Sequence, residues 1–217
     1  TPPQQSPHHI STAKSILSCG QKAKPIEISL AHNCILFLNE LLEFPRSCLE
    51  ALRQPLEDRE IHIARAEHSI TYPASFLLIA TMNPCPCGNL GSTKECVCSA
   101  YSVDQYQKKL SGPLMDSIDL FVKVEEIRPE MLLVEPEKGT TIIVRDAVLS
   151  AGRMQKVRNI AAYNSELTNK DIRTLKIEDE AKQLLDDASQ RLGLSPRAYF
   201  RVLKVARTIA DLNGEKI

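Results

Sequence analysis

The sequence predicts an α/β domain built on a parallel sheet, followed by an all-helical domain. Two short apolar runs, Ile35–Leu38 and Ser75–Thr81, are bounded by polar residues, which is typical of strands buried in a parallel sheet. In the C-terminal third, apolar residues instead recur at helical spacing. We therefore expect an α/β portion over residues 1–127, a linker rich in Pro, Glu and Lys over residues 128–139, and a helical portion over residues 140–217.

A helix is expected after the first apolar run. Pro45 suits its beginning, because the first helical turn leaves its backbone N–H groups unbonded and proline has none. Leu49, Leu52 and Leu56 then fall on one face, and Pro55 is expected to strain the end of this helix.

The rest of the α/β portion combines a hairpin, a helix and a further strand. Residues 60–72 contain two short segments, IHIAR and SITY, joined by a polar turn, which predicts a β-hairpin. Residues 103–110 have a helical pattern. The segment Asp119–Val124 alternates more than the other apolar runs and predicts a third strand near the edge of the sheet. A short helix is also expected around Ser11–Ser18.

The helical portion is predicted to contain three helices: Ile142–Ala162, Glu178–Leu192 and Pro196–Leu212. Ser195 is the expected N-cap of the last helix, because its hydroxyl can accept a hydrogen bond from an unbonded N–H of the first turn. On that helix we interpret Lys204 as part of a solvated face. For Arg207 a contact with nucleotide or with DNA stays open.

Composition narrows the class of protein. Lys+Arg and Asp+Glu both number 27, so the chain lacks the overall basic character of a dedicated nucleic-acid binder, although local basic clusters remain possible. No run approaches the roughly 18 consecutive apolar residues of a membrane helix, and the N-terminal residues do not resemble a signal peptide. We expect a cytoplasmic protein with no membrane partner. In that setting, the seven cysteines favour metal binding and buried thiols over disulfides.

Four of the cysteines form a compact C-x-C…C-x-C array: Cys85, Cys87, Cys96 and Cys98. Four thiolates on two short arms can surround a tetrahedral ion, and zinc is the metal that matches them best. Such a site would be structural, since protein fills all four positions, and it would tie down the loop directly after Asn83. An iron–sulfur cluster, or four reduced thiols without a metal, are the alternatives.

Polar residues follow both apolar runs. Asn39 and Glu40 come directly after the first run, and Asn83 follows the second. Parallel strands place ligand sites at their carboxyl ends. There a carboxylate can polarise a water molecule while an amide senses the terminal phosphoryl group of a nucleotide. The alternative for Glu40 is a purely local role at the end of a strand or the start of a helix.

Four stretches of the sequence resemble one known family and occur in the same order as in that family. They are EISLAHNCILFLNELLEF (27–44), the stretch from ALRQPLED to NPCPCG (51–88), LSGPLMDSIDL (110–120) and SPRAYFRVLKVARTIADL (195–212). The family is that of the magnesium-chelatase-like AAA+ ATPases of the ComM/YifB (competence protein) type. The resemblance implies that residues 1–127 are the C-terminal part of an AAA+ αβα sandwich of the P-loop NTPase type. It also implies that residues 140–217 are an all-helical lid domain.

The resemblance also implies roles for single residues. Ile35–Glu40 matches the Walker B strand, whose last acidic residue, here Glu40, activates the attacking water. Asn83 matches the sensor-1 position that orients this water, and Arg197 matches the sensor-2 arginine of the lid. ATP and Mg²⁺ are the implied cofactors, with Asn39 at the position beside the metal. The hairpin of residues 60–72 resembles an insertion that this clade directs toward the central pore of a ring.

Three features depart from the family pattern. Asn39 stands where the family has the Asp that holds magnesium through its water shell, and a neutral amide should lower magnesium affinity. Ser117 stands where the family has an arginine finger, a group worth about 10³–10⁵ in rate. No G-x-x-x-x-G-K-[ST] phosphate loop (Walker A) occurs in the chain. In the family this loop lies upstream, after a domain that resembles that of the Lon protease, so the chain alone is not expected to bind ATP well.

The resemblance implies a ring-forming motor, expected as a hexamer of copies of the chain, that couples ATP hydrolysis to the remodelling of DNA in recombination or natural transformation. One alternative is the ATPase subunit of a metal-chelatase complex, which would lack the Lon-like upstream domain. The other is a non-hydrolysing scaffold in which Asn39 and Ser117 have ended turnover.

Overall fold

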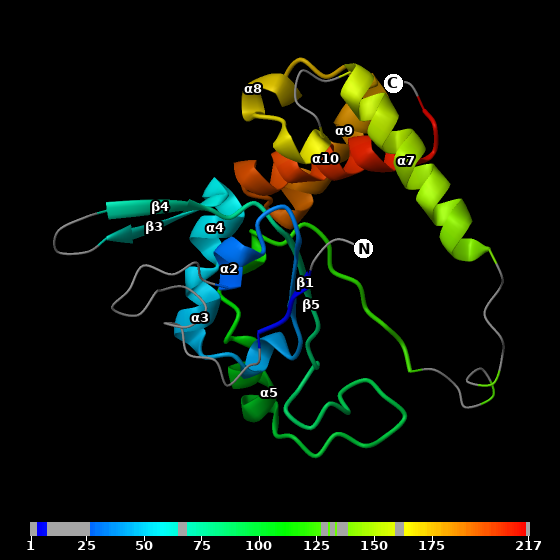
Figure 1. Ribbon diagram of the computed structural model, residues 1–217. Coiled ribbons are helices and arrows are strands. Elements are labelled where there is room, and N and C mark those ends of the chain that lie inside the picture. Colours follow the sequence, from blue (N-terminus) through cyan, green and yellow to red (C-terminus); the bar gives the residue numbers. More distant parts are fainter. Residues whose placement is uncertain are drawn as a thin grey trace. The chain divides into compact units, whose positions relative to one another are not determined.

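The computed structural model describes residues 4–7, 27–64, 69–126, 130, 133, 139–158 and 163–215. The chain divides into two compact units (Figure 1). The first consists of residues 1–118 and 122–126, and the second of residues 119–121 and 127–217. All the described strands belong to the first unit. The expected helix at residues 11–18 and most of the expected linker lie outside the described residues.

A three-stranded parallel sheet lies at the centre of the first unit. β2 (Ile35–Leu38) lies between β1 (Gln4–Gln5) and β5 (Leu77–Ala80). Both neighbours pair with β2 in parallel, and Ile35 to Leu38 pair in register with Leu77 to Ala80. The prediction that the two apolar runs are strands of one parallel sheet is therefore confirmed.

Short helices and the β2 strand bury one apolar core in this unit. α2 (Glu27–Leu30) precedes β2, and the 3₁₀ helix η1 (Leu41–Glu43) follows it. The largest side chains of the core, all nearly inaccessible to solvent, are Ile28, Leu36, Leu38, Leu42, Phe44, Leu49, Leu52 and Leu114. The core thus includes residues on both sides of the turn at the end of β2, where Asn39 and Glu40 lie.

The single helix predicted after Pro45 is in fact two helices, α3 (Arg46–Ala51) and α4 (Arg53–Asp58). The interruption falls at Leu52. Pro55 has no N–H to donate to the carbonyl of Ala51, four residues earlier, and its ring crowds that carbonyl. The expectation that Pro55 strains only the end of one helix was therefore wrong.

The predicted hairpin is confirmed as β3 (Glu60–Ala64) paired antiparallel with β4 (Ser69–Pro73). In Figure 1 the two strands lie side by side and extend outward from α4. The predicted helix at residues 103–110 is α5 (Ala100–Gln107). It begins earlier than predicted because Ser99 caps it: the Ser99 hydroxyl accepts a hydrogen bond from the backbone N–H of Ser102 at 3.1 Å. A further short helix, α6 (Gly112–Met115), follows.

The predicted strand at Asp119–Val124 is wrong. Its backbone belongs to none of the ladders formed by the described residues, and the side chains of Leu120, Phe121, Val122 and Val124 are exposed. The alternation indicated a half-buried edge strand. A strand forms, however, only where a neighbour accepts and donates its backbone hydrogen bonds, and no described strand does so here.

The second unit is helical throughout its described part. Its elements are α7 (Thr140–Arg158), η3 (Asn164–Glu166), α8 (Asn169–Ile172), α9 (Asp179–Leu192) and α10 (Pro196–Leu212). α7, α9 and α10 confirm the three predicted helices, whereas α8 and η3 were not predicted. Ser195 caps α10 as expected, with its hydroxyl accepting a hydrogen bond from the N–H of Ala198 at 3.2 Å. α10 packs against α7, η3 and α8. None of the helices in the described ranges combines the length and the apolar composition needed to cross a bilayer.

Candidate functional site

Thr81 joins the ends of β2 and β5. Its hydroxyl donates to Oδ1 of Asn39 at 2.6 Å and accepts from the backbone N–H of Glu40 at 3.2 Å. Its backbone N–H donates to the carbonyl of Leu38 at 3.0 Å, and its carbonyl accepts from the N–H of Leu41 at 2.8 Å. The two strand ends therefore form one hydrogen-bonded edge. Sequence reasoning missed Thr81, although a hydroxyl at the last position of an apolar run was a signal for it.

Glu40 has a backbone conformation that residues other than glycine adopt rarely. Its φ and ψ are 56° and 54°, in the left-handed region. Such a conformation costs about 1–3 kcal/mol and is found more often at functional sites. Glu40 also stands at the N-cap position of η1, but within residues 40–44 its side chain does not cap that helix. The strand thus ends in a sharp turn, and the carboxylate is half-buried beside it.

Asn83 is exposed and lies against the cysteine-rich loop. A Cβ atom added to Gly88 would be 4.0 Å from Cγ of Asn83, so that loop lies close to the amide. Gly88 itself has a φ of +79°, a conformation that favours glycine. The structure thus brings Asn39 and Glu40 together at one strand end and seats Asn83 next to the cysteine loop after the neighbouring strand.

Two further positions singled out from the sequence, Arg197 and Ser117, are not among the residues at the ends of β2 and β5. Arg197 is exposed on the first turn of α10 and belongs to the second unit, so its role toward a nucleotide stays a prediction. Ser117 is buried, and its hydroxyl lies 3.2 Å from Oε1 of Glu57 and 3.1 Å from the carbonyl of Pro113. The serine thus connects the end of α6 to α4 inside the first unit.

The four cysteine sulfurs converge on one point. The Sγ atoms of Cys85, Cys87 and Cys96 are 3.5, 3.7 and 3.6 Å apart, and all four sulfurs, including that of Cys98, lie within 4.8 Å of one another. A tetrahedral zinc ion with metal–sulfur distances of ~2.3 Å requires sulfur–sulfur separations of ~3.8 Å. The described residues therefore match the donor set and the size of a Cys₄ metal site. The backbone N–H of Leu90 also donates to Sγ of Cys85, at 3.3 Å.

The thiols of this cluster have unequal pKa values. A hydrogen bond from the backbone N–H of Asn89 lowers the pKa of Cys87 to about 6. A backbone hydrogen bond from Cys98 lowers the pKa of Cys96, but burial and the neighbouring sulfurs outweigh it and raise this pKa to about 12. The backbone donor thus favours the thiolate form of Cys87, and a bound cation would offset the repulsion that raises the pKa of Cys96.

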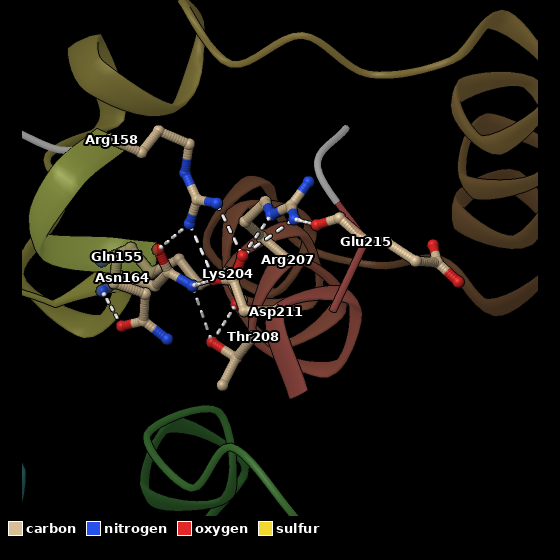
Figure 2. Close-up of polar contacts among 8 residues, drawn as sticks. All are labelled: Gln155, Arg158, Asn164, Lys204, Arg207, Thr208, Asp211 and Glu215. Atoms are coloured by element: carbon tan, nitrogen blue, oxygen red, sulfur yellow. Dashed lines mark hydrogen bonds and ion pairs between the residues drawn. The ribbon is translucent and has the colours of Figure 1, made fainter. Parts of the chain in front are cut away.

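The second unit has its own polar cluster, centred on Asp211 (Figure 2). Arg158 donates to both carboxylate oxygens at 2.6 and 2.7 Å, and Nη2 of Arg207 donates to Oδ1 at 2.8 Å. Nδ2 of Asn164 donates to Oδ2 at 2.9 Å. Arg207, for which the sequence leaves a contact with nucleotide or DNA open, is buried and has a structural partner inside the unit, Asp211.

Comparison with family models gives the same order of regions along the chain. The model described as magnesium chelatase, subunit ChlI, matches residues 1–132. The model of the C-terminal region of the same subunit matches residues 138–217. The chain belongs to the magnesium chelatase subunit ChlI family. This family is AAA+ with a helical C-terminal domain, so the predicted fold class and family are both confirmed.

Individual relatives agree with this family. The competence protein ComM of Haemophilus influenzae is 43% identical over 216 residues, which cover 99% of this chain and 42% of that protein. The uncharacterized protein YifB of Salmonella typhimurium is 41% identical over 213 residues, covering 97% of this chain and 42% of that protein. YifB of Escherichia coli is 39% identical over 219 residues, with 99% and 42% covered. The chain thus spans less than half the length of the relatives it matches.

Proposed function

We propose that this chain forms part of a ring-shaped, hexameric AAA+ motor that couples ATP binding and hydrolysis to the remodelling of DNA in the cytoplasm. The observation that carries the ATPase proposal is the bridge formed by Thr81 between the ends of β2 and β5. It holds Asn39 and Glu40 at the edge of the sheet where parallel strands bind ligands, next to the strand that leads to Asn83.

In this proposal Glu40 is the general base that polarises the attacking water, and Asn83 orients that water toward the terminal phosphate of ATP. Asn39 and Arg197 complete the nucleotide-binding set, Asn39 on the magnesium side and Arg197 from the helical lid. The residues that correspond to the core and the lid are 1–127 and 140–217, with 128–139 as the linker.

Asn39 is the residue that most directly affects magnesium. Its Oδ1 accepts a hydrogen bond from Thr81, as a carboxylate oxygen would. What the amide lacks is the negative charge that attracts a hard cation. We therefore expect the geometry of the edge to survive replacement by aspartate, while the affinity for Mg²⁺ increases.

The cysteine cluster is proposed as a structural zinc site with Cys85, Cys87, Cys96 and Cys98 as ligands. All four positions are filled by thiolates, so the ion would have no open position for substrate or water. Its role would be to hold the loop that follows Asn83 in one conformation.

The DNA substrate is the part of the proposal that rests on relatives. The relative from Haemophilus influenzae is named as a competence protein, and competence is the uptake of DNA for natural transformation. By analogy, we propose that this chain takes part in the recombination of DNA. A role in a metal-chelatase complex is the competing assignment within the same family.

Steady-state ATP turnover by the full-length protein, with and without single-stranded DNA, tests this function. The unmodified protein is compared with its Asn39→Asp variant, for which the magnesium concentration at half-maximal turnover should fall about tenfold. Asn33→Asp serves as the matched control, because it adds the same charge to an exposed position before β2.

Each outcome assigns the chain to one class. Turnover that DNA stimulates supports the motor. Turnover without a response to DNA contradicts the DNA substrate and favours the chelatase assignment. A complete absence of turnover in both the unmodified protein and Asn39→Asp contradicts the ATPase and indicates a scaffold.

A further inference from the structure

Three hydrogen bonds connect the end of α5 and the turn after it to the segments that follow the strand ends. The hydroxyl of Tyr106 donates to Oε1 of Glu43 at 3.0 Å. Nζ of Lys109 donates to the carbonyl of Leu42 at 2.7 Å. Nε2 of Gln107 donates to the carbonyl of Pro84 at 2.9 Å. The end of α5 and the turn after it therefore contact the segment after β2 and the loop after β5 at the same time.

The contacts fall directly beside the proposed catalytic residues. Leu42 and Glu43 follow Glu40 within η1, and Pro84 follows Asn83 in the chain. A displacement of η1 or of Pro84 would move the neighbouring side chains by a similar amount. The contacts from residues 106–109 therefore bear on both loops that carry the proposed catalytic side chains.

Two of the three side chains that make the contacts, Tyr106 and Lys109, are themselves held in place. Tyr106 is buried, and burial together with the hydrogen bond to Glu43 raises its pKa to about 12, so its hydroxyl keeps the proton that it donates. The ammonium of Lys109 lies 5.1 Å from the centre of the Tyr106 ring, within the range of a cation–π contact. Its bond to the Leu42 carbonyl is charge-assisted and is therefore stronger than one between neutral groups.

The cysteine cluster lies within the same closed segment. The bond from Gln107 to Pro84 joins the two ends of a loop that contains all four cysteines, and Ser99, the cap of α5, directly follows Cys98. A metal ion bound by the four cysteines would restrain the conformation of this loop. The bond from Gln107 to Pro84 keeps the two ends of the loop close together.

We propose that α5 and the cysteine loop act as a brace, with Tyr106, Gln107 and Lys109 as positioning residues that fix Glu40 and Asn83 relative to one another. The catalytic consequence rests on the proposed ATPase function. The restraint of residues 40–43 and 81–84 by the brace does not depend on that function, because it concerns only the positions of these two segments.

A pair of lysine variants tests the brace in the full-length protein. Lys109→Met removes the bond to Leu42, whereas the matched control Lys108→Met removes an exposed ion pair with Asp104 on the same helix. Amide hydrogen exchange over residues 40–43 and 81–84 should be about tenfold faster in Lys109→Met than in Lys108→Met. Equal exchange in these two segments would overturn the brace.

Tyr106→Phe provides a second, milder variant that keeps the ring and removes only the hydroxyl. It should also accelerate exchange over residues 40–43, whereas Tyr101→Phe, at an exposed position of α5, should not. Acceleration confined to α5 itself in Tyr106→Phe would indicate a local structural role and contradict the brace.

ATP turnover adds a readout that loss of stability alone would not produce. For Lys109→Met we expect kcat to fall about tenfold with KM for ATP unchanged, and Lys109→Arg to restore kcat, since a guanidinium can still donate to the Leu42 carbonyl. A parallel rise of KM, or no rescue, contradicts positioning. If even the unmodified protein lacks turnover, the proposed function fails, and hydrogen exchange still decides whether the brace exists.

Discussion

The two polar clusters of this chain differ in how completely the protein itself satisfies them. In the second unit, the carboxylate of Asp211 is fully buried and receives hydrogen bonds from Arg158, Arg207 and Asn164. In the first unit, four sulfurs converge on one point, and the side chains of Asn39 and Asn83, which follow the two strands, are exposed.

This difference suggests that the two clusters have different roles, one in the stability of the fold and one in the proposed function. Buried charges are tolerated when partners of opposite charge and good geometry surround them, and removing one partner is then costly. A group of thiolates at one point, in contrast, is stable only with a cation supplied from outside. The Asp211 cluster thus has the contacts of a group that stabilises the helical unit, whereas the sheet edge and the cysteine loop carry the proposed ligand sites.

The largest effect is expected from removal of the proposed zinc ion. A chelator should accelerate amide exchange over residues 84–98 by at least about 10⁴-fold, in line with the binding free energy of a structural zinc site, while exchange in α10 should stay unchanged. Cys96→Ser should lower the zinc content to well below one ion per chain, as measured by elemental analysis. Cys34→Ser, a half-buried thiol outside the cluster, is the control and should keep the metal. Zinc-free protein with unchanged exchange would remove the distinction between the two clusters.

The next largest effect should follow Asp211→Asn. This change keeps the size of the side chain but leaves Arg158 and Arg207 without their carboxylate partner, at a cost of about 3–5 kcal/mol in the free energy of unfolding. Denaturant unfolding of the helical unit, followed through exchange in α7 and α10, measures it. Asp187→Asn, at an exposed position of α9, should change stability by less than about 0.5 kcal/mol. Similar results for both variants would show that the buried cluster contributes nothing special.

The same carboxylate predicts a dependence on pH. Burial raises the pKa of Asp211, but the hydrogen bonds from Arg158, Asn164 and Arg207 outweigh it and lower the value from 3.8 to about 2. A lowered pKa in the folded state means that the stabilisation is complete above about pH 4 and is lost as the pH falls toward 2. The stability difference between the unmodified protein and Asp211→Asn should therefore shrink by about 2 kcal/mol over this interval. A difference independent of pH would contradict the ionised state of Asp211.

The smallest effect is expected at the sheet edge. Thr81→Val removes the hydroxyl that joins Asn39 to the backbone of Glu40, and should cost about 0.5–1 kcal/mol because the site is exposed. Thr81→Ser keeps the hydroxyl and should behave like the unmodified protein. Hydrogen exchange of the Glu40 backbone amide measures the difference. Equal exchange rates in the valine and serine variants would show that the Thr81 hydroxyl does not stabilise the turn.

Features that depend on local spacing could be predicted from the amino-acid sequence alone. The apolar runs predicted β2 and β5, helical periodicity predicted α7, α9 and α10, and the cysteine array predicted the convergence of four sulfurs. Short-range patterns encode these features because strand burial, helix amphipathicity and paired ligand arms all repeat within a few residues. Family membership followed for the same reason, since its motifs are short and lie in order along the chain.

Contacts between distant positions depend on the folded structure and could not be predicted from local patterns. The bonds from Tyr106 to Glu43, from Lys109 to Leu42 and from Gln107 to Pro84 span 63, 67 and 23 residues. No local pattern encodes which partner a side chain meets over such separations. The alternating segment at residues 119–124 predicted a strand but lacks a pairing neighbour among the described strands. Arg207 occupied a helical position open to several roles until its burial against Asp211 was known. In each case the outcome depended on a partner brought close by folding, which the sequence around the residue does not specify.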